Sequence, residues 1–100
     1  MFASYKDTDV KRLLDGRERE KKFPPDILPT THRKLVMLDA VSSLKSLRVT
    51  PGNRLEKLSG NRNGQHSIRI NDQYRICFIW DNGNAYDVEI AVYHQTGEIP

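Results

Sequence analysis

Two arginines in neighbouring stretches of alternating sequence are the side chains best suited to bind a phosphate. Arg69 lies in the stretch Ser67–Ile70 and Arg75 in the stretch Tyr74–Trp80, and the intervening Asn71-Asp72-Gln73 is typical of a tight turn. In an antiparallel hairpin these two side chains come close together, and two guanidinium groups can then hold one phosphate.

His94 is the histidine placed best for proton transfer. It follows the last stretch of alternating sequence, and a strand end on an open sheet face is a common location for a group that gives and takes protons near neutral pH. A lone histidine near a C-terminus is, however, usually an exposed residue without a catalytic role. His32, on the exposed side of a predicted helix, and His66, at the start of a predicted strand, are interpreted as structural or surface residues.

Cofactor and metal chemistry have no sequence pattern to support them. No spacing of His, Cys, Asp and Glu resembles a metal site, and no glycine-rich loop precedes a helix. No cofactor is therefore expected. The single cysteine, Cys77, lies in an apolar stretch and is interpreted as a small buried hydrophobe in a reducing compartment.

The second half of the chain alternates with a period of two, which predicts strands that each bury one face. The apolar positions are Ile68 and Ile70; Tyr74, Ile76, Phe78 and Trp80; and Tyr86, Val88, Ile90 and Val92. Turn sequences at 71–73 and 81–84 join these strands into an antiparallel meander. A shorter strand around Leu55–Leu58, followed by a turn at Gly60–Gly64, is expected to precede them.

The intervening positions of these strands form a polar face of mixed charge. They are Ser67, Arg69, Arg75, Cys77, Asp87, Glu89, Ala91 and Tyr93. An antiparallel sheet covered by helices on one side commonly leaves its other side to solvent, and this alone explains polar alternation. Arg69 and Arg75 are accordingly expected on a solvent-facing side.

The first half of the chain is helical in pattern. Phe2–Tyr5 fits an edge strand, and Asp7 or Thr8 can cap a helix that ends before Gly16. The following charge cluster, Arg17–Lys22, stops at Phe23-Pro24-Pro25, where a helix cannot continue.

A second helix is predicted from Asp26, as N-cap, to about Leu44. Leu28, Leu35 and Leu38 or Val41 supply its buried stripe, Thr30–Lys34 faces solvent, and Pro29 must lie in its first turn. Helices followed by a run of strands predict an α+β domain.

Length and charge limit the class of protein. A chain of 100 residues, 37% apolar and 29% charged, can build one core. Its net charge of +3 suggests a polyanionic partner without requiring one. The longest apolar runs, Leu35–Leu38 and Ile76–Trp80, are much shorter than the roughly 20 residues that span a membrane. With no secretory signal legible either, a cytoplasmic location is expected.

Several short motifs, in the order in which they occur along the chain, together resemble the HigB, or plasmid maintenance killer, family of the RelE/ParE superfamily. They are Pro51–Glu56, Leu58–Gly64, Ser67–Phe78, Ala85–Ile90 and Tyr93-His94. The resemblance extends from about Phe2 to His94. Residues 1–94 are therefore expected to form one RelE-like toxin domain, followed by a C-terminal tail at 95–100.

This resemblance implies a fold in which two N-terminal helices pack on one face of a curved antiparallel sheet, while the other face receives mRNA in the ribosomal decoding site. It also implies a ribosome-dependent endoribonuclease that needs no metal, because a 2′-hydroxyl of the RNA attacks the adjacent phosphate. Such chemistry requires a base, an acid and cations near the phosphate.

The family's functional residues carry over by position. Arg69 and Arg75 match the basic residues that hold and polarise the phosphate. Tyr93 and His94 match a C-terminal Tyr-His pair, in which His94 is the first choice for proton transfer. Glu56 falls where relatives carry His or Glu, and it is interpreted as a base or as a group that orients His94.

The sequence also departs from the family pattern. Arg62 matches a turn arginine that binds RNA backbone, but Asn61 and Asn63 replace its usual Asp and Lys neighbours. Val92 stands where an acidic residue usually precedes Tyr-His. Because that carboxylate would orient His94 or raise its basicity, Val92 predicts a weakened site. Alternation places Val92 on the buried face, unless the strand ends or turns outward there.

The resemblance further implies partners: a HigA-like helix-turn-helix antitoxin, the 70S ribosome with its mRNA, and operator DNA reached through the antitoxin. One alternative is a RelE-like domain that no longer cuts and acts as antitoxin partner and transcriptional corepressor. Val92 favours that alternative, and the joint presence of Arg69, Arg75, Tyr93 and His94 opposes it. Another alternative, a nonenzymatic RNA-binding domain, would expose several aromatic side chains for stacking.

Overall fold

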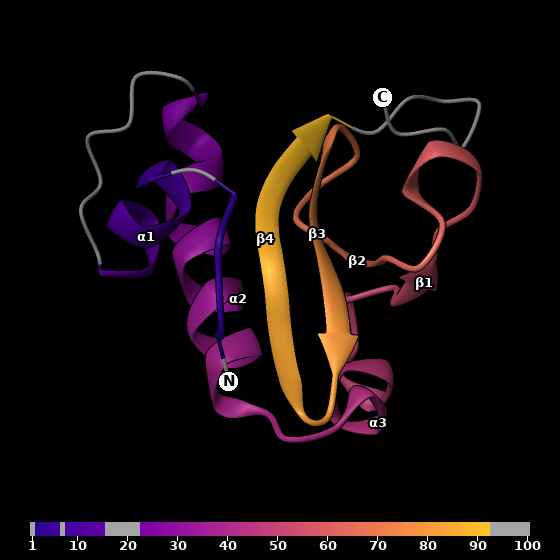
Figure 1. Ribbon diagram of the computed structural model, residues 1–100. Helices are drawn as coiled ribbons and strands as arrows, with labels where there is room; N and C mark the ends of the chain where they lie inside the picture. The colour runs from indigo at the N-terminus through magenta and orange to yellow at the C-terminus, as the bar shows by residue number, and fades with distance from the viewer. Residues whose placement is uncertain (1, 7, 16–22, 93–100) are drawn as a thin grey trace.

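In a computed structural model of the chain, helices cover one face of an antiparallel sheet (Figure 1). The structure describes residues 2–6, 8–15 and 23–92. Within these residues the helices are α1 (Thr8–Leu14), α2 (Leu28–Ala40) and α3 (Leu44–Val49), with 3-10 turns η1 (Pro25–Ile27) and η2 (Gly60–Arg62). The strands β1 (Glu56–Lys57), β2 (His66–Arg69), β3 (Tyr74–Asp81) and β4 (Asn84–Val92) lie side by side in sequence order. The predicted α+β fold class is confirmed.

The second predicted helix is divided into two. α2 begins at Leu28 rather than after Asp26, because Pro25–Ile27 forms the 3-10 turn η1. Pro29 takes the first turn of α2, where its missing N–H costs no hydrogen bond. α2 ends at Ala40 rather than near Leu44, since Val41 adopts extended backbone. Ser43 then starts α3 by accepting a hydrogen bond from the Ser46 N–H.

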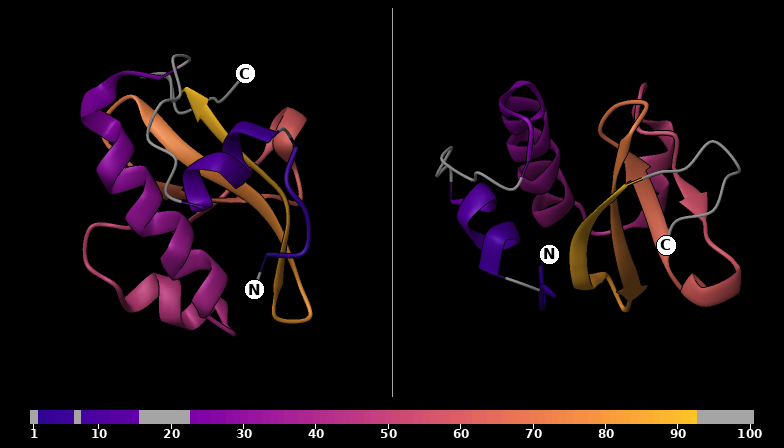
Figure 2. Two further views of the ribbon diagram at one scale, coloured as in Figure 1. Left: turned by 90° about the vertical axis from the view of Figure 1, so that its left-hand side faces the viewer. Right: turned by 90° about the horizontal axis from the view of Figure 1, so that it is seen from above.

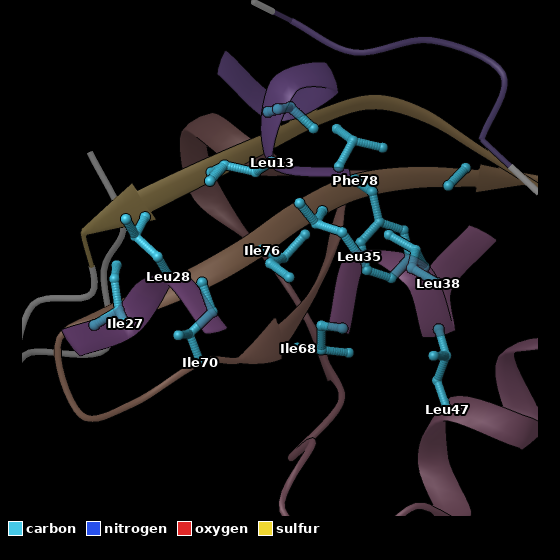
Figure 3. Close-up of a cluster of buried hydrophobic side chains, with 13 residues drawn as sticks. Leu13, Ile27, Leu28, Leu35, Leu38, Leu47, Ile68, Ile70, Ile76 and Phe78 are labelled. Atoms are coloured by element: carbon cyan, nitrogen blue, oxygen red, sulfur yellow. The ribbon is translucent and has the colours of Figure 1, made fainter. Parts of the chain in front are cut away.

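One hydrophobic core lies between the helices and the sheet. Leu35 and Leu38 of α2, Leu47 of α3 and Phe78 of β3 are completely buried there. Figure 3 shows these side chains meeting between the layers. Each large side chain removed from water contributes roughly 1.5 to 3 kcal/mol, so this layer holds the sheet in a fixed position under the helices.

The expectation that Thr30–Lys34 faces solvent is wrong at two positions. Thr31 is completely buried, and its hydroxyl donates to the Ile27 carbonyl at 2.8 Å. Lys34 is 5% exposed, and its ammonium group reaches across to the loop that follows α3. His32 has a structural role, because its Nδ1 lies 2.6 Å from the Leu13 carbonyl and so links α2 to α1.

A β-bulge in β4 changes which residues share a face. Cys77 pairs with Glu89 but Ile79 pairs with Tyr86, so β4 contains one residue more than β3 between these points. Asp87, inside the bulge, has a φ of 51°. Val88 packs in the main core, whereas Tyr86 pairs with a residue of the opposite face. The prediction that Tyr86 and Val88 share one face is therefore wrong.

The N-terminal segment lies along the outer edge of β4, as Figure 1 shows. Two isolated parallel bridges join Phe2 to Ala85 and Tyr5 to Val88, so the segment pairs with the edge of the sheet but does not form the predicted strand. The turned views of Figure 2 place α1 and α2 together on one side of the sheet. No helix in the described residues is long and apolar enough to cross a membrane.

Candidate active site

The sheet face opposite the helices carries the predicted site, and its centre is covered. Leu58, Cys77 and Ala91 pack into a second, small cluster on this face. The expectation of a solvent-facing surface is wrong there, because the chain after β1 folds over the strands. Cys77 is completely buried, as predicted, and burial raises the pKa of its thiol to about 11.

Arg75 is buried rather than solvent-facing, with only 3% of the residue exposed. Its Nε donates to the Ser67 hydroxyl at 2.6 Å, and its Nη2 donates to the Arg54 carbonyl at 2.5 Å and to the Ser67 carbonyl at 3.3 Å. One guanidinium group thus joins β3, β2 and the loop before β1. Its position makes Arg75 part of the framework that holds the site.

Arg69 stands directly opposite Arg75 in the β2–β3 ladder, so the predicted juxtaposition is confirmed. Its side chain is 29% exposed and forms an ion pair with Asp72, whose own side chain is 92% exposed. An exposed pair of this kind is worth about 0 to 1 kcal/mol. An incoming phosphate can therefore replace Asp72 as the partner of Arg69 at little cost.

Glu56 places a carboxylate beside the guanidinium group of Arg75. It faces Ser67 in the β1–β2 ladder, and its Oε1 lies 3.8 Å from Arg75 Nη1. The Glu56 side chain is 44% exposed while that of Arg75 is 4% exposed. Glu56 therefore presents a carboxylate at the open rim, held by a buried cation.

Arg62 is tied to the sheet rather than extended into solvent. Its Nη1 lies 2.5 Å from Glu89 of β4, and both side chains are largely buried. Lys6 of the N-terminal segment also contacts Glu89, at 3.0 Å. This cluster fastens η2 and the N-terminal segment to the middle of β4. The assignment of Arg62 to RNA binding stays a prediction.

The backbone of Arg69 is fixed by residues that the sequence did not single out. Its N–H donates to the Asn53 carbonyl at 2.6 Å, and its carbonyl accepts from Lys34 Nζ at 2.5 Å. The Lys34 ammonium also donates to the Gly52 carbonyl, and Asn53 is buried against Leu47. Pro51-Gly52-Asn53 was legible as a chain break, but nothing in the sequence showed that this loop holds the backbone of Arg69.

The buried Lys34 predicts a pH dependence of stability. Burial, and then the charges of Arg33, Arg69 and Arg75, lower its pKa from the usual 10.5. The unfolded chain therefore binds the Lys34 proton at pH values where the folded chain has released it, and stability rises with pH in that window. The free energy of unfolding of the wild type, minus that of Lys34→Met, is expected to rise as pH increases toward 10.5 in urea titrations. A difference that falls over this range contradicts the assignment.

Tyr93 and His94 lie outside the described residues, so their contacts stay a prediction. β4 ends at Val92, which stands opposite Tyr74, one position beyond the pair Arg75 and Ala91. The last described residue of β4 therefore lies next to the arginines. Val92 keeps the register of the strand, opposite Tyr74, and is nevertheless 46% exposed, so the expectation from alternation that it is buried is wrong.

The candidate site is thus a set of side chains suited to bind and polarise a phosphate. Arg69 offers an accessible cation, Glu56 offers a carboxylate, and Arg75 holds both strands in register. Within residues 2–6, 8–15 and 23–92, no group of three or more His, Cys, Asp or Glu side chains is placed to hold a metal ion.

Comparison with known proteins gives consistent results. A family model described as the RelE-like toxin of the type II toxin-antitoxin system HigB matches residues 3–94. The chain is 40% identical over 85 residues to Toxin HigB-1 of Vibrio cholerae, covering 85% of this chain and 90% of that protein. It is 32% identical to an uncharacterized protein of Haemophilus influenzae, covering 81% of this chain and 80% of that one.

A solved structure, the YoeB-YefM complex from Staphylococcus aureus, contains a chain with a similar fold. The TM-score is 0.52 at 17% sequence identity, and the match covers 94% of this chain and 98% of that chain. At this level of identity the likeness concerns the fold.

Proposed function

The chain belongs to the HigB-like family of RelE-like toxins of type II toxin-antitoxin systems, and from this we propose that it is an endoribonuclease that cleaves messenger RNA on the ribosome. One structural observation carries the proposal. Arg69 and Arg75 stand opposite each other, and Arg75 lies beside the carboxylate of Glu56, on the sheet face that the helices leave free.

The proposed reaction is an internal transesterification of RNA. A base removes the proton of a 2′-hydroxyl, and the oxygen forms a bond to the adjacent phosphorus. The bond from phosphorus to the 5′-oxygen breaks, and an acid protonates that oxygen. The products are a 2′,3′-cyclic phosphate and a 5′-hydroxyl. Arg69 would stabilise the charge that builds on the phosphate oxygens.

The roles of base and acid fall to Glu56, Tyr93 and His94. Glu56 is exposed enough to meet a substrate, and its carboxylate can accept the 2′-hydroxyl proton or orient His94. His94 is our choice for proton transfer to the leaving oxygen. Because Arg75 is buried and saturated with protein contacts, we assign it to holding Glu56 and the two strands rather than to contacting RNA.

We propose the ribosome as the place of cleavage because this protein carries little net charge. A net charge of +3 is small for efficient capture of free RNA by charge alone. Cleavage also needs an RNA strand held in an extended, unstacked shape. A ribosome supplies mRNA at high local concentration and in a fixed geometry.

An experiment in cells tests this dependence on translation. The protein is expressed without an antitoxin, together with a reporter mRNA that has either an intact or a mutated start codon. We expect growth arrest, and new 5′ ends only in the translated reporter. Equal cutting of both reporters would contradict the ribosome as the site of action.

Val92→Asp restores the acidic residue that usually precedes Tyr-His. Since Val92 is 46% exposed, an aspartate there avoids the penalty of about 1 to 3 kcal/mol for a buried, unpaired polar group. We expect the variant to remain folded and to cleave ribosome-bound mRNA faster, by roughly tenfold, because an oriented histidine transfers protons more efficiently. Val92→Asn is the matched control, and a folded but slower Val92→Asp would show that the missing carboxylate is no defect.

We also propose a HigA-like helix-turn-helix antitoxin as the protein partner, through which operator DNA is reached indirectly. The fold neighbour is itself found in a complex with a second protein, YefM. Val92 favours an alternative function as a corepressor that no longer cuts. Absence of both growth arrest and mRNA cleavage, together with intact antitoxin binding, would support this alternative.

A further inference from the structure

A second group of cationic residues lies on the helix-covered face of the sheet, on the opposite side from Glu56. It consists of Arg48 of α3, Lys57 of β1 and His66 of β2, which we call the α3–β1 patch. Arg48 and Lys57 are exposed and His66 is half-buried. Successive side chains of a strand point to opposite faces, so Lys57 is turned away from the face that carries Glu56.

The patch is arranged by the pairing of the strands. Lys57 stands directly opposite His66, and His66 stands directly opposite Phe78. The imidazole ring of His66 stacks on Phe78 with centroids 6.2 Å apart, and Phe78 in turn meets the edge of the partly exposed Trp80. The His66 Nδ1 is buried without a hydrogen-bond partner in the described part of the chain. Packing therefore fixes this ring directly across the strand pair from Lys57.

The electrostatic environment of the patch is positive. Burial lowers the pKa of His66, and the charges of Lys57 and Arg48 lower it further. Glu56, although adjacent to Lys57 in sequence, lies beside Arg75 on the other face. Lys45 adds a further exposed cation to α3. Cations gathered beside partly exposed rings favour a polyanion that can also stack, which describes RNA.

We propose that the α3–β1 patch binds the phosphate backbone of ribosomal RNA while the Arg69 face holds mRNA. The two surfaces lie on opposite sides of one sheet, so a second RNA segment must approach the patch. The inference rests on the proposed function in taking the ribosome as the carrier of the substrate. In this arrangement, Arg48 and Lys57 supply part of the contact by which the protein docks on the ribosome.

Binding to vacant 70S ribosomes, which contain no mRNA, tests the patch separately from cleavage. Co-sedimentation is measured over a series of KCl concentrations for the wild type and for Arg48→Ser with Lys57→Ser. Losing two phosphate contacts should reduce the slope of log affinity against log salt by about 1.4 and weaken binding more than about tenfold near ~0.1 M salt.

Two matched variants complete this experiment. Lys11→Ser with Arg12→Ser removes the same charge from α1, where both side chains are 54% exposed, and should bind as the wild type does. Arg48→Lys with Lys57→Arg keeps the charge and should also bind. Circular dichroism checks that each variant is folded.

The proposal is overturned if the patch variant binds ribosomes with the affinity and salt slope of the wild type, or if the α1 variant loses as much. Loss of antitoxin binding alone would assign the patch to a protein partner instead and would also overturn it. A wild type that binds vacant ribosomes through the patch but cuts no mRNA would contradict the proposed function and leave this inference standing.

Discussion

Arg75→Ala is expected to destabilise the protein by about 2 to 5 kcal/mol, a large part of the 5 to 15 kcal/mol typical of a domain. The substitution removes a buried guanidinium group that donates to Ser67 and to the Arg54 carbonyl. These acceptors would stay buried without a partner, and the space of the side chain would be left empty. Urea unfolding, followed by circular dichroism, measures the loss.

Arg69→Ala is the matched control, because it removes the same side chain from the opposite position of the same ladder. Its exposed pair with Asp72 contributes about 1 kcal/mol or less, so the variant should stay folded. Its cleavage of ribosome-bound mRNA should fall by at least about 100-fold, since a charge-stabilising group is lost. Equal stability of the two variants would show that the framework role of Arg75 is wrong.

His94→Ala is expected to reduce ribosome-dependent cleavage by about 10² to 10⁴-fold, the usual contribution of general acid or base catalysis. The residue follows Val92, which is 46% exposed at the end of β4, so the fold should be unaffected. Single-turnover cleavage on programmed ribosomes measures the effect, and binding to vacant ribosomes serves as the control for docking. A variant that cuts at the wild-type rate would remove His94 from the mechanism.

The fold class and the pairing of Arg69 with Arg75 could be predicted because both depend on local patterns. A period of two fixes which residues share a strand face, and Asn71-Asp72-Gln73 fixes the hairpin that brings the two arginines together. Antiparallel pairing of β2 with β3 in this register confirms the prediction.

The burial of Arg75 could not be predicted from the same pattern. Alternation distinguishes two faces but does not show whether a later segment folds over one of them. Leu58 packs on Cys77 and Ala91 only after the chain has crossed the sheet face, a contact that depends on tertiary structure. The extra residue at Asp87 was hidden for a similar reason, because a bulge shifts the phase without a glycine to mark it.

The hydrogen bonds by which Lys34 and Asn53 hold the backbone of Arg69 could not be predicted from the sequence either. A lysine in the middle of a helix is ordinarily a surface residue, and here it is buried because two backbone carbonyls, of Gly52 and Arg69, receive its hydrogen bonds. Those carbonyls come from segments 18 and 35 residues away along the chain. The sequence therefore predicted Arg69 as a candidate for phosphate binding and missed the residues that hold its backbone.

Cleavage on the ribosome is tested by comparing one mRNA in two states, bound to 70S ribosomes and free in solution, under single-turnover conditions with purified protein. The 5′ ends are mapped and the rates are compared for the wild type and for the folded variant Arg69→Ala. We expect cleavage of the ribosome-bound mRNA to be at least about 100-fold faster than that of free mRNA, with both activities lost in the variant. Equal rates on free and bound mRNA, or cleavage by Arg69→Ala at the wild-type rate, would contradict the proposed function.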